Sequence, residues 1–108
     1  VMAGEIFDVA LDLRRSSPTF GKCAATNISG GGHRMMWIPP GFAHGFLVLS
    51  EHAIVLYKTT DYYAPEHERS LLWNDTAVGI EWPLAGAQPL LKPKDAAGAP
   101  LADAEIFP

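Results

Sequence analysis

The sequence predicts an all-β domain, built as an antiparallel sandwich or barrel. Short apolar stretches of strand length recur between turn residues, and the 108 residues include Gly 10 and Pro 9. Amphipathic helix patterns are almost absent, which argues against a helical or α/β class. A chain of this length forms one domain with a real core, so residues 1–108 are taken as a single unit.

The first predicted strand covers residues 6–14, where apolar and polar positions alternate. One face carries Phe7, Val9, Leu11 and Leu13. The other face carries Asp8, Ala10, Asp12 and Arg14. A period of two predicts a strand that is buried on one face only.

Two further strands are predicted before the middle of the chain. The first covers roughly residues 22–28 and ends at a glycine run at 30–32, which suits a turn with unusual dihedral angles. The second covers about residues 35–38. It stops at Pro-Pro-Gly at 39–41, because consecutive prolines cannot donate to a ladder.

The β-rich stretches on either side of Glu51 and His52 predict a hairpin with these two residues as its loop. Phe46 then pairs with Tyr57, and His44 lies diagonal to Tyr57 on the same face, at roughly 7–8 Å between backbone positions. A loop longer or shorter by one residue would put the two side chains on opposite faces, so this prediction depends on the register.

The residues that follow the predicted hairpin are expected to cover the sheet. Residues 61–84 are rich in aromatic and turn residues, which predicts long ordered loops and short strands, with one helical turn near 75–78. Asp95 is expected to cap a short helical piece through residues 96–97.

Composition excludes several classes of partner. The formal net charge is -4 and the basic residues are scattered, so no nucleic-acid footprint appears. No apolar stretch approaches membrane length, so no membrane contact is expected. Cys23 stands alone, which excludes a disulfide within the chain and a cysteine zinc site, and favours a reducing, cytoplasmic compartment.

His44 and Tyr57 are the candidate functional pair. Together with Thr59 they would place a few polar groups on an apolar face that includes Phe46, which is typical of a small-ligand pocket. A histidine that simply packs in the core or in a turn is an equally good interpretation. A packed tyrosine ring with its hydroxyl at the rim is the commoner role for a residue like Tyr57.

Other chemistries find little support in the sequence. The four histidines are spaced too evenly for a paired-ligand motif, so no metal is expected. Ser50 and Ser70 lack a nucleophile-elbow motif. The charged stretch at 66–69 and the pair at 94–95 are, by default, solvated surface.

Several blocks nevertheless resemble one family, the dTDP-4-dehydrorhamnose 3,5-epimerases. They occur in the family's order from end to end of the chain. The blocks are Gly4–Arg14, Ser16–Gly21, Trp37–Phe46, Leu56–Tyr63, Trp73–Asp75 and Lys94–Asp95.

The resemblance implies a cupin-like jelly roll, an antiparallel double-stranded β-helix, here without the family's N-terminal strands. It also implies a homodimer, no metal or other cofactor, and a dTDP-sugar as ligand. Family members epimerise C3 and C5 of a dTDP-4-keto-6-deoxyhexose on the way to dTDP-L-rhamnose, by removing a proton α to a ketone and returning one to the opposite face.

Residue by residue, the resemblance makes Tyr57 the catalytic acid and Asp95 the carboxylate that orients the catalytic histidine. His44, Glu68 and Lys94 would contact the substrate. The family's base lies in an Arg-Gly-Leu-His-type motif, followed by a lysine for the enolate, both upstream of the block where this chain begins.

Two interpretations of this difference stay open. The chain can be the C-terminal portion of a full epimerase. Alternatively, it is a natural short protein that lacks activity and serves as a sugar-nucleotide-binding module or a structural dimer. In the second case, unpaired sheet edges should promote dimerisation, strand exchange or aggregation.

Overall fold

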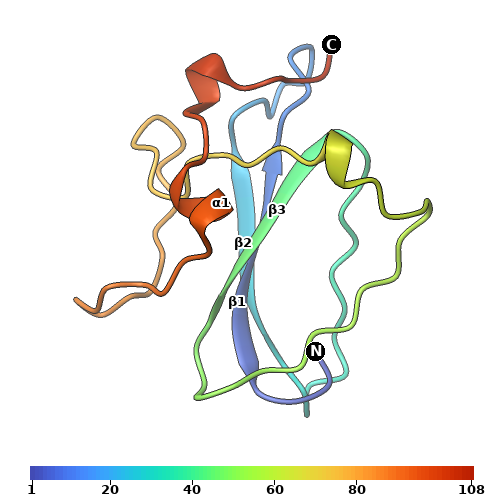
Figure 1. Ribbon diagram of the computed structural model, residues 1–108. Coiled ribbons are helices and arrows are strands. Elements are labelled where there is room, and N and C mark those ends of the chain that lie inside the picture. Colours follow the sequence, from blue (N-terminus) through green and yellow to red (C-terminus); the bar gives the residue numbers. More distant parts are fainter.

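Three antiparallel strands form the sheet of this protein in the computed structural model, which describes residues 1–108 (Figure 1). The strands are β1 (Glu5–Asp12), β2 (Cys23–Ser29) and β3 (Phe42–Val48), in the spatial order β2-β1-β3. Three short helical elements follow: η1 (Pro65–His67), α1 (Pro93–Ala96) and η2 (Leu101–Asp103). No helix has the length and apolar character needed to cross a membrane.

The central strand β1 is buried on both faces. Val9 and Leu11 are buried on one face, and Asp8, Ala10 and Asp12 are buried on the other. The expectation of a half-buried strand is therefore wrong, although its position is confirmed. Both edges of β1 are paired, and Figure 1 shows the rest of the chain passing on both sides of the sheet.

The segment between residues 73 and 84 covers one face of the sheet. Trp82 packs edge-on against Phe7 of β1, with 5.9 Å between ring centroids. The indole Nε1 of Trp82 donates to the carbonyl oxygen of Trp73 at 2.7 Å, which satisfies the polar atom of a partly buried ring. The predicted helical turn near 75–78 is present, with Asp75 accepting from the backbone N–H of Ala77.

Two predicted strands are absent. Residues 35–38 form no ladder, and Met35 and Trp37 are exposed. The hairpin through Glu51 and His52 does not form either, because the backbone of Ile54 bonds to Met2 and Ala3, which precede β1. That bridge leads the chain away from β3, whose sheet partner is β1.

The short helix α1 begins at Pro93, not at Asp95. Lys92 is its N-cap residue, and proline is well suited to the first helical turn because its missing N–H would have no partner there. Asp95 therefore lies inside the helix, and its predicted capping role is wrong.

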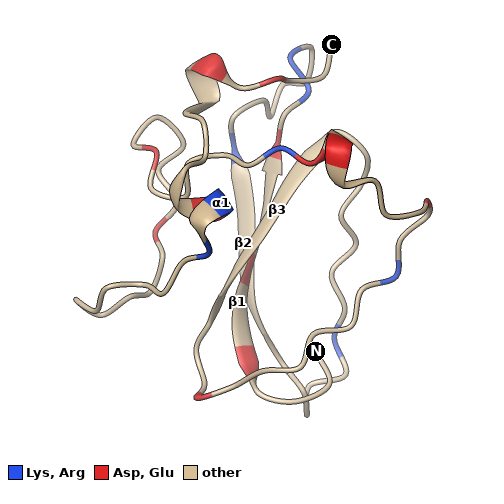
Figure 2. Ribbon diagram, in the orientation of Figure 1, with Lys and Arg blue, Asp and Glu red and all other residues tan.

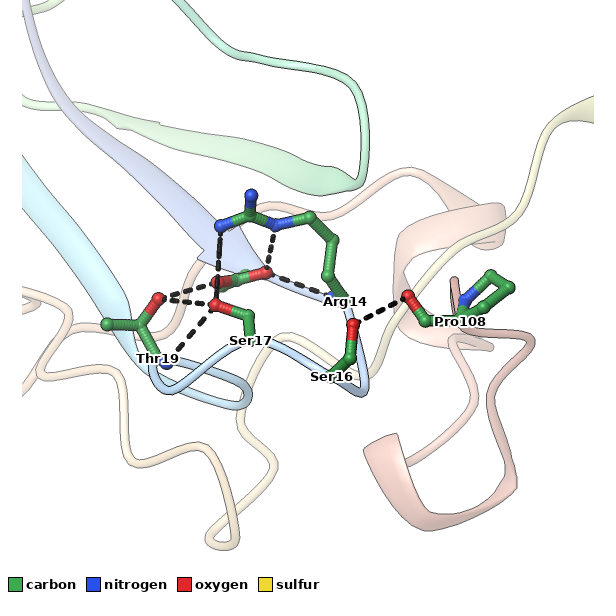
Figure 3. Close-up of polar contacts among 6 residues, drawn as sticks. Arg14, Ser16, Ser17, Thr19 and Pro108 are labelled. Carbon is green, nitrogen blue, oxygen red and sulfur yellow. Dashed lines mark hydrogen bonds and ion pairs between the residues drawn. The ribbon is translucent and has the colours of Figure 1, made fainter.

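Asp12, at the end of β1, is the centre of a dense hydrogen-bond cluster with Arg14, Ser17 and Thr19, which are labelled in Figure 3. Its carboxylate accepts from the backbone N–H, Nε and Nη2 of Arg14 at 2.9, 2.9 and 2.8 Å. The hydroxyls of Ser17 and Thr19 each donate to it at 2.6 Å. Asp12 is 1% exposed, so these donors replace the water that burial removes.

The same cluster connects the turn after β1 to the beginning of β3. The Arg14 guanidinium lies over the Phe42 ring, 4.8 Å from its centroid. Gly41 has a φ of +88°, and a Cβ there would lie 2.6 Å from Cγ of Arg14, so no larger residue fits without movement. The cluster therefore also shapes the turn at Gly41. The strand β3, which carries His44, begins directly after this turn.

The hydrogen bond from Arg14 holds the pKa of Asp12 well below its ordinary value. A carboxyl whose folded pKa is depressed contributes stability above its unfolded pKa of about 3.9, and this stability is lost as the pH falls further. Asp12→Asn should lower the melting temperature at neutral pH. It should also lose less additional stability than the wild type when the pH drops from about 5 to about 2.

Thermal unfolding followed by circular dichroism at several pH values tests this expectation. The exposed Glu51, which makes no ion pair, provides the matched control Glu51→Gln. An Asp12→Asn chain with the same melting temperature and the same acid dependence as the wild type would contradict the role given to the cluster.

Candidate functional site

His44 and Tyr57 lie beside each other on the face of the sheet opposite Trp82. Their ring centroids are 6.1 Å apart and the rings are nearly perpendicular. Phe46 completes the group, at 6.1 Å from His44 and 6.5 Å from Tyr57. The predicted proximity of the pair is confirmed, although the predicted hairpin is not the reason for it. Tyr57 reaches His44 from a segment that lies outside the strands and helices.

Asp8 connects this group to the core. Its Oδ1 lies 2.5 Å from Nε2 of His44, and the two side chains are 7% and 25% exposed. Asp8 and His44 belong to the neighbouring strands β1 and β3, whose side chains alternate between the two faces of the sheet. The buried carboxylate therefore anchors an imidazole whose other edge remains accessible.

The pKa of Tyr57 is raised, first because its ring has lost solvent and second because the charge of Asp8 opposes ionisation of the phenol. The hydroxyl is therefore protonated at neutral pH. Tyr57 is 56% exposed, so a ligand can reach it. A protonated phenol that a ligand can reach is able to donate its proton.

Glu68 and Lys94 form a second group. Glu68 follows η1, Lys94 lies in α1, and Nζ of Lys94 donates to Oε2 of Glu68 at 3.3 Å. This bond and the charge of Glu68 raise the pKa of Lys94, so it remains an ammonium group. Asp95 is half-buried, and its carboxylate accepts no hydrogen bond from a side chain or backbone group.

Glu68 also lines an open hollow of about 440 Å³, formed mainly by the segment 59–64 and His67. Thr59 is exposed at its rim and donates to the carbonyl oxygen of Asp61, so it does not join His44 and Tyr57 as predicted. The charge view in Figure 2 shows basic residues dispersed over loops and α1 on both sides of the sheet. No group of three or more His, Cys, Asp or Glu side chains lies close enough to hold a metal ion.

Asp8 is the residue of this site that the sequence patterns missed. The alternation along β1 assigned it to a solvent-facing side. Charged residues are depleted in strands and are seldom buried without a partner, so two aspartates alternating with Ala10 in an apolar strand were an available signal. The pattern could not identify His44 as the partner of one and Arg14 as the partner of the other.

Comparison with known proteins gives a consistent result. Residues 1–103 match the family model described as dTDP-4-dehydrorhamnose 3,5-epimerase. The chain is 60% identical over 105 residues to the dTDP-4-dehydrorhamnose 3,5-epimerase of Pseudomonas aeruginosa, covering 97% of this chain and 58% of that protein. It is 58% identical over 104 residues to the Salmonella typhimurium enzyme, covering 96% and 56%.

Solved structures agree. The dTDP-6-deoxy-D-glucose-3,5-epimerase of Legionella pneumophila, in complex with dTDP-4-keto-L-rhamnose, superimposes with a TM-score of 0.87 at 49% identity over 97% of this chain and 55% of that one. The Bacillus anthracis epimerase with TDP and pyrophosphate bound gives a TM-score of 0.88 at 43% identity over 93% and 56%. The chain thus spans a little more than half the length of these relatives, and it belongs to the dTDP-4-dehydrorhamnose 3,5-epimerase family.

Proposed function

We propose that this chain carries the proton-donating side of an epimerase site that acts at C3 and C5 of a dTDP-4-keto-6-deoxyhexose, in the formation of dTDP-L-rhamnose. The observation that carries the proposal is the group of Asp8, His44 and Tyr57 on one open face of the sheet. The complex of the Legionella pneumophila relative with dTDP-4-keto-L-rhamnose supports the ligand class.

Tyr57 is the acid in this proposal. Epimerisation next to a ketone requires that a proton be removed from one face of the sugar and that another be returned to the opposite face. A phenol that is protonated at neutral pH and partly open to solvent can return this proton and be reprotonated by water. His44 contacts the sugar in this proposal, because the family resemblance assigns the base to the histidine of an Arg-Gly-Leu-His-type motif and not to this position.

The second group supplies further ligand contacts. Glu68 and Lys94 each retain an exposed side and can exchange part of their mutual bond for ligand atoms. Asp95 has a carboxylate free to accept from the N–H of an imidazole, which suits the role of orienting a catalytic histidine. That histidine corresponds to the family's Arg-Gly-Leu-His-type motif, which does not occur among these 108 residues.

The expected assembly is a cytoplasmic, cofactor-independent homodimer with the family's jelly-roll fold. Large apolar side chains on the surface support association: Met35, Trp37 and Leu56 are 93%, 71% and 63% exposed. The exposure of these side chains also favours the second candidate, a module that binds a sugar nucleotide without turnover, because such a module needs no enclosed site.

Isotope exchange tests whether this chain supplies the catalytic acid but not the base. The 108-residue chain should place no deuterium from D₂O at C3 or C5 of the keto sugar above the buffer background, as read by mass spectrometry. Joining it to the part of the Pseudomonas aeruginosa relative that it does not match should restore epimerisation. Tyr57→Phe in this fusion should lower the rate by about 10²–10⁴, the usual contribution of a general acid.

Two results would contradict the proposal. One is robust exchange by the chain alone that disappears in Tyr57→Phe, because it would locate a base among these residues. The other is an active fusion whose rate does not change in Tyr57→Phe, because the acid would then lie elsewhere.

Calorimetric titration tests the ligand contacts separately from turnover. dTDP-glucose should bind the chain, and His44→Ala should weaken it by about 3- to 10-fold, the value of one hydrogen bond to the sugar. Binding of dTDP, which has no sugar, should be unchanged in the same variant. If neither ligand gives heat at millimolar concentration, ligand binding is excluded. An unchanged affinity and oligomer size in His44→Ala would favour a purely structural dimer.

A further inference from the structure

Asp8 is a buried carboxylate whose only side-chain hydrogen-bond partner is His44. It lies in the middle of the central strand, where a carboxylate is retained only if a donor satisfies it. From this contact we infer that Asp8 is a positioning residue: it fixes the tautomer of His44 with the proton on Nε2, so that Nδ1 is the atom offered to the ligand. The inference rests on the proposed role of His44 as a sugar contact.

The register of the sheet explains how the two side chains meet. Asp8 is directly opposite Phe46, and His44 is directly opposite Ala10. Asp8 and His44 are therefore diagonal neighbours on one face, a separation that a long side chain can bridge. The methyl group of Ala10 leaves room for the imidazole to incline along β1 toward the carboxylate. A larger residue at position 10 would occupy that space.

The chemistry of the pair determines which nitrogen carries the proton. An ionised carboxylate can only accept hydrogen bonds, so the atom facing it must be a donor. Nε2 of the neutral imidazole is therefore protonated, and Nδ1 keeps its lone pair. Nδ1 makes no hydrogen bond within the protein. It is available to accept from a hydroxyl group of the sugar, which makes hydroxyl recognition the chemistry of this contact.

The same carboxylate also acts on Tyr57, since its charge contributes to the raised pKa of the phenol. One buried group thus orients the ligand contact and adds, after the loss of solvent, to the raised pKa of the neighbouring phenol. The two effects share a cause but differ in kind, because the first depends on a directed hydrogen bond and the second on charge alone.

Nitrogen-15 NMR of the histidine-labelled 108-residue chain tests the inference directly, at about pH 9, where an ordinary imidazole is neutral. His44 should show a protonated Nε2 and an unprotonated Nδ1. In Asp8→Asn, the carboxamide can donate to Nε2 as well as accept from it, so the population with the proton on Nδ1 should rise. Thr26→Val, which alters the residue opposite Asp8 on β2, is the matched control and should leave the tautomer unchanged.

A wild-type chain with the proton of His44 on Nδ1 would overturn the inference, whether or not any variant folds. A folded Asp8→Asn chain with unaltered His44 resonances would overturn it too. Titration with dTDP-glucose completes the test, and Asp8→Asn should weaken binding by about the same factor as His44→Ala. The NMR readout needs no ligand. The expected tautomer in a chain that binds no dTDP-sugar would therefore support the positioning of His44 while refuting the proposed function.

Discussion

Two buried carboxylates on one face of the central strand organise this domain. Asp8 and Asp12 alternate along β1, and neither can remain in the interior without hydrogen-bond donors. The carboxylate of Asp12 accepts hydrogen bonds from the turn that leads toward β2. The carboxylate of Asp8 is hydrogen-bonded to the imidazole of His44 on β3. The strand that forms the core therefore also determines the shape of the turn that follows it and the position of the candidate site.

The two carboxylates differ in where their donors come from. The donors of Asp12 lie within seven residues along the chain, so the cluster is local and forms whenever the turn forms. The donor of Asp8 is 36 residues away, so this bond exists only once β1 and β3 are paired. The local cluster around Asp12 stabilises the turn after β1. A long-range pair between a buried carboxylate and a partly exposed imidazole places the imidazole where a ligand can reach it.

The candidate site lies on the side of the sheet where β3 exposes His44, Phe46 and Val48. β2 and β3 each leave one edge unpaired, and large apolar side chains such as Trp37 and Leu56 are exposed. The chain covers 58% of the length of its Pseudomonas aeruginosa relative. Asp95 is half-buried, and its carboxylate has no hydrogen-bond partner within the chain.

The sequence by itself determined the family, the position of β1 and β2, and the candidate residues, because motif blocks and strand periodicity are local properties of the chain. It also predicted that His44 and Tyr57 would be neighbours, but by a hairpin that does not form. Only the tertiary structure decided that Ile54 pairs with Ala3, that both faces of β1 are covered, and that Asp8 bonds to His44. Each of these depends on contacts between distant segments, and a periodic pattern describes which residues share a face without saying what lies against it.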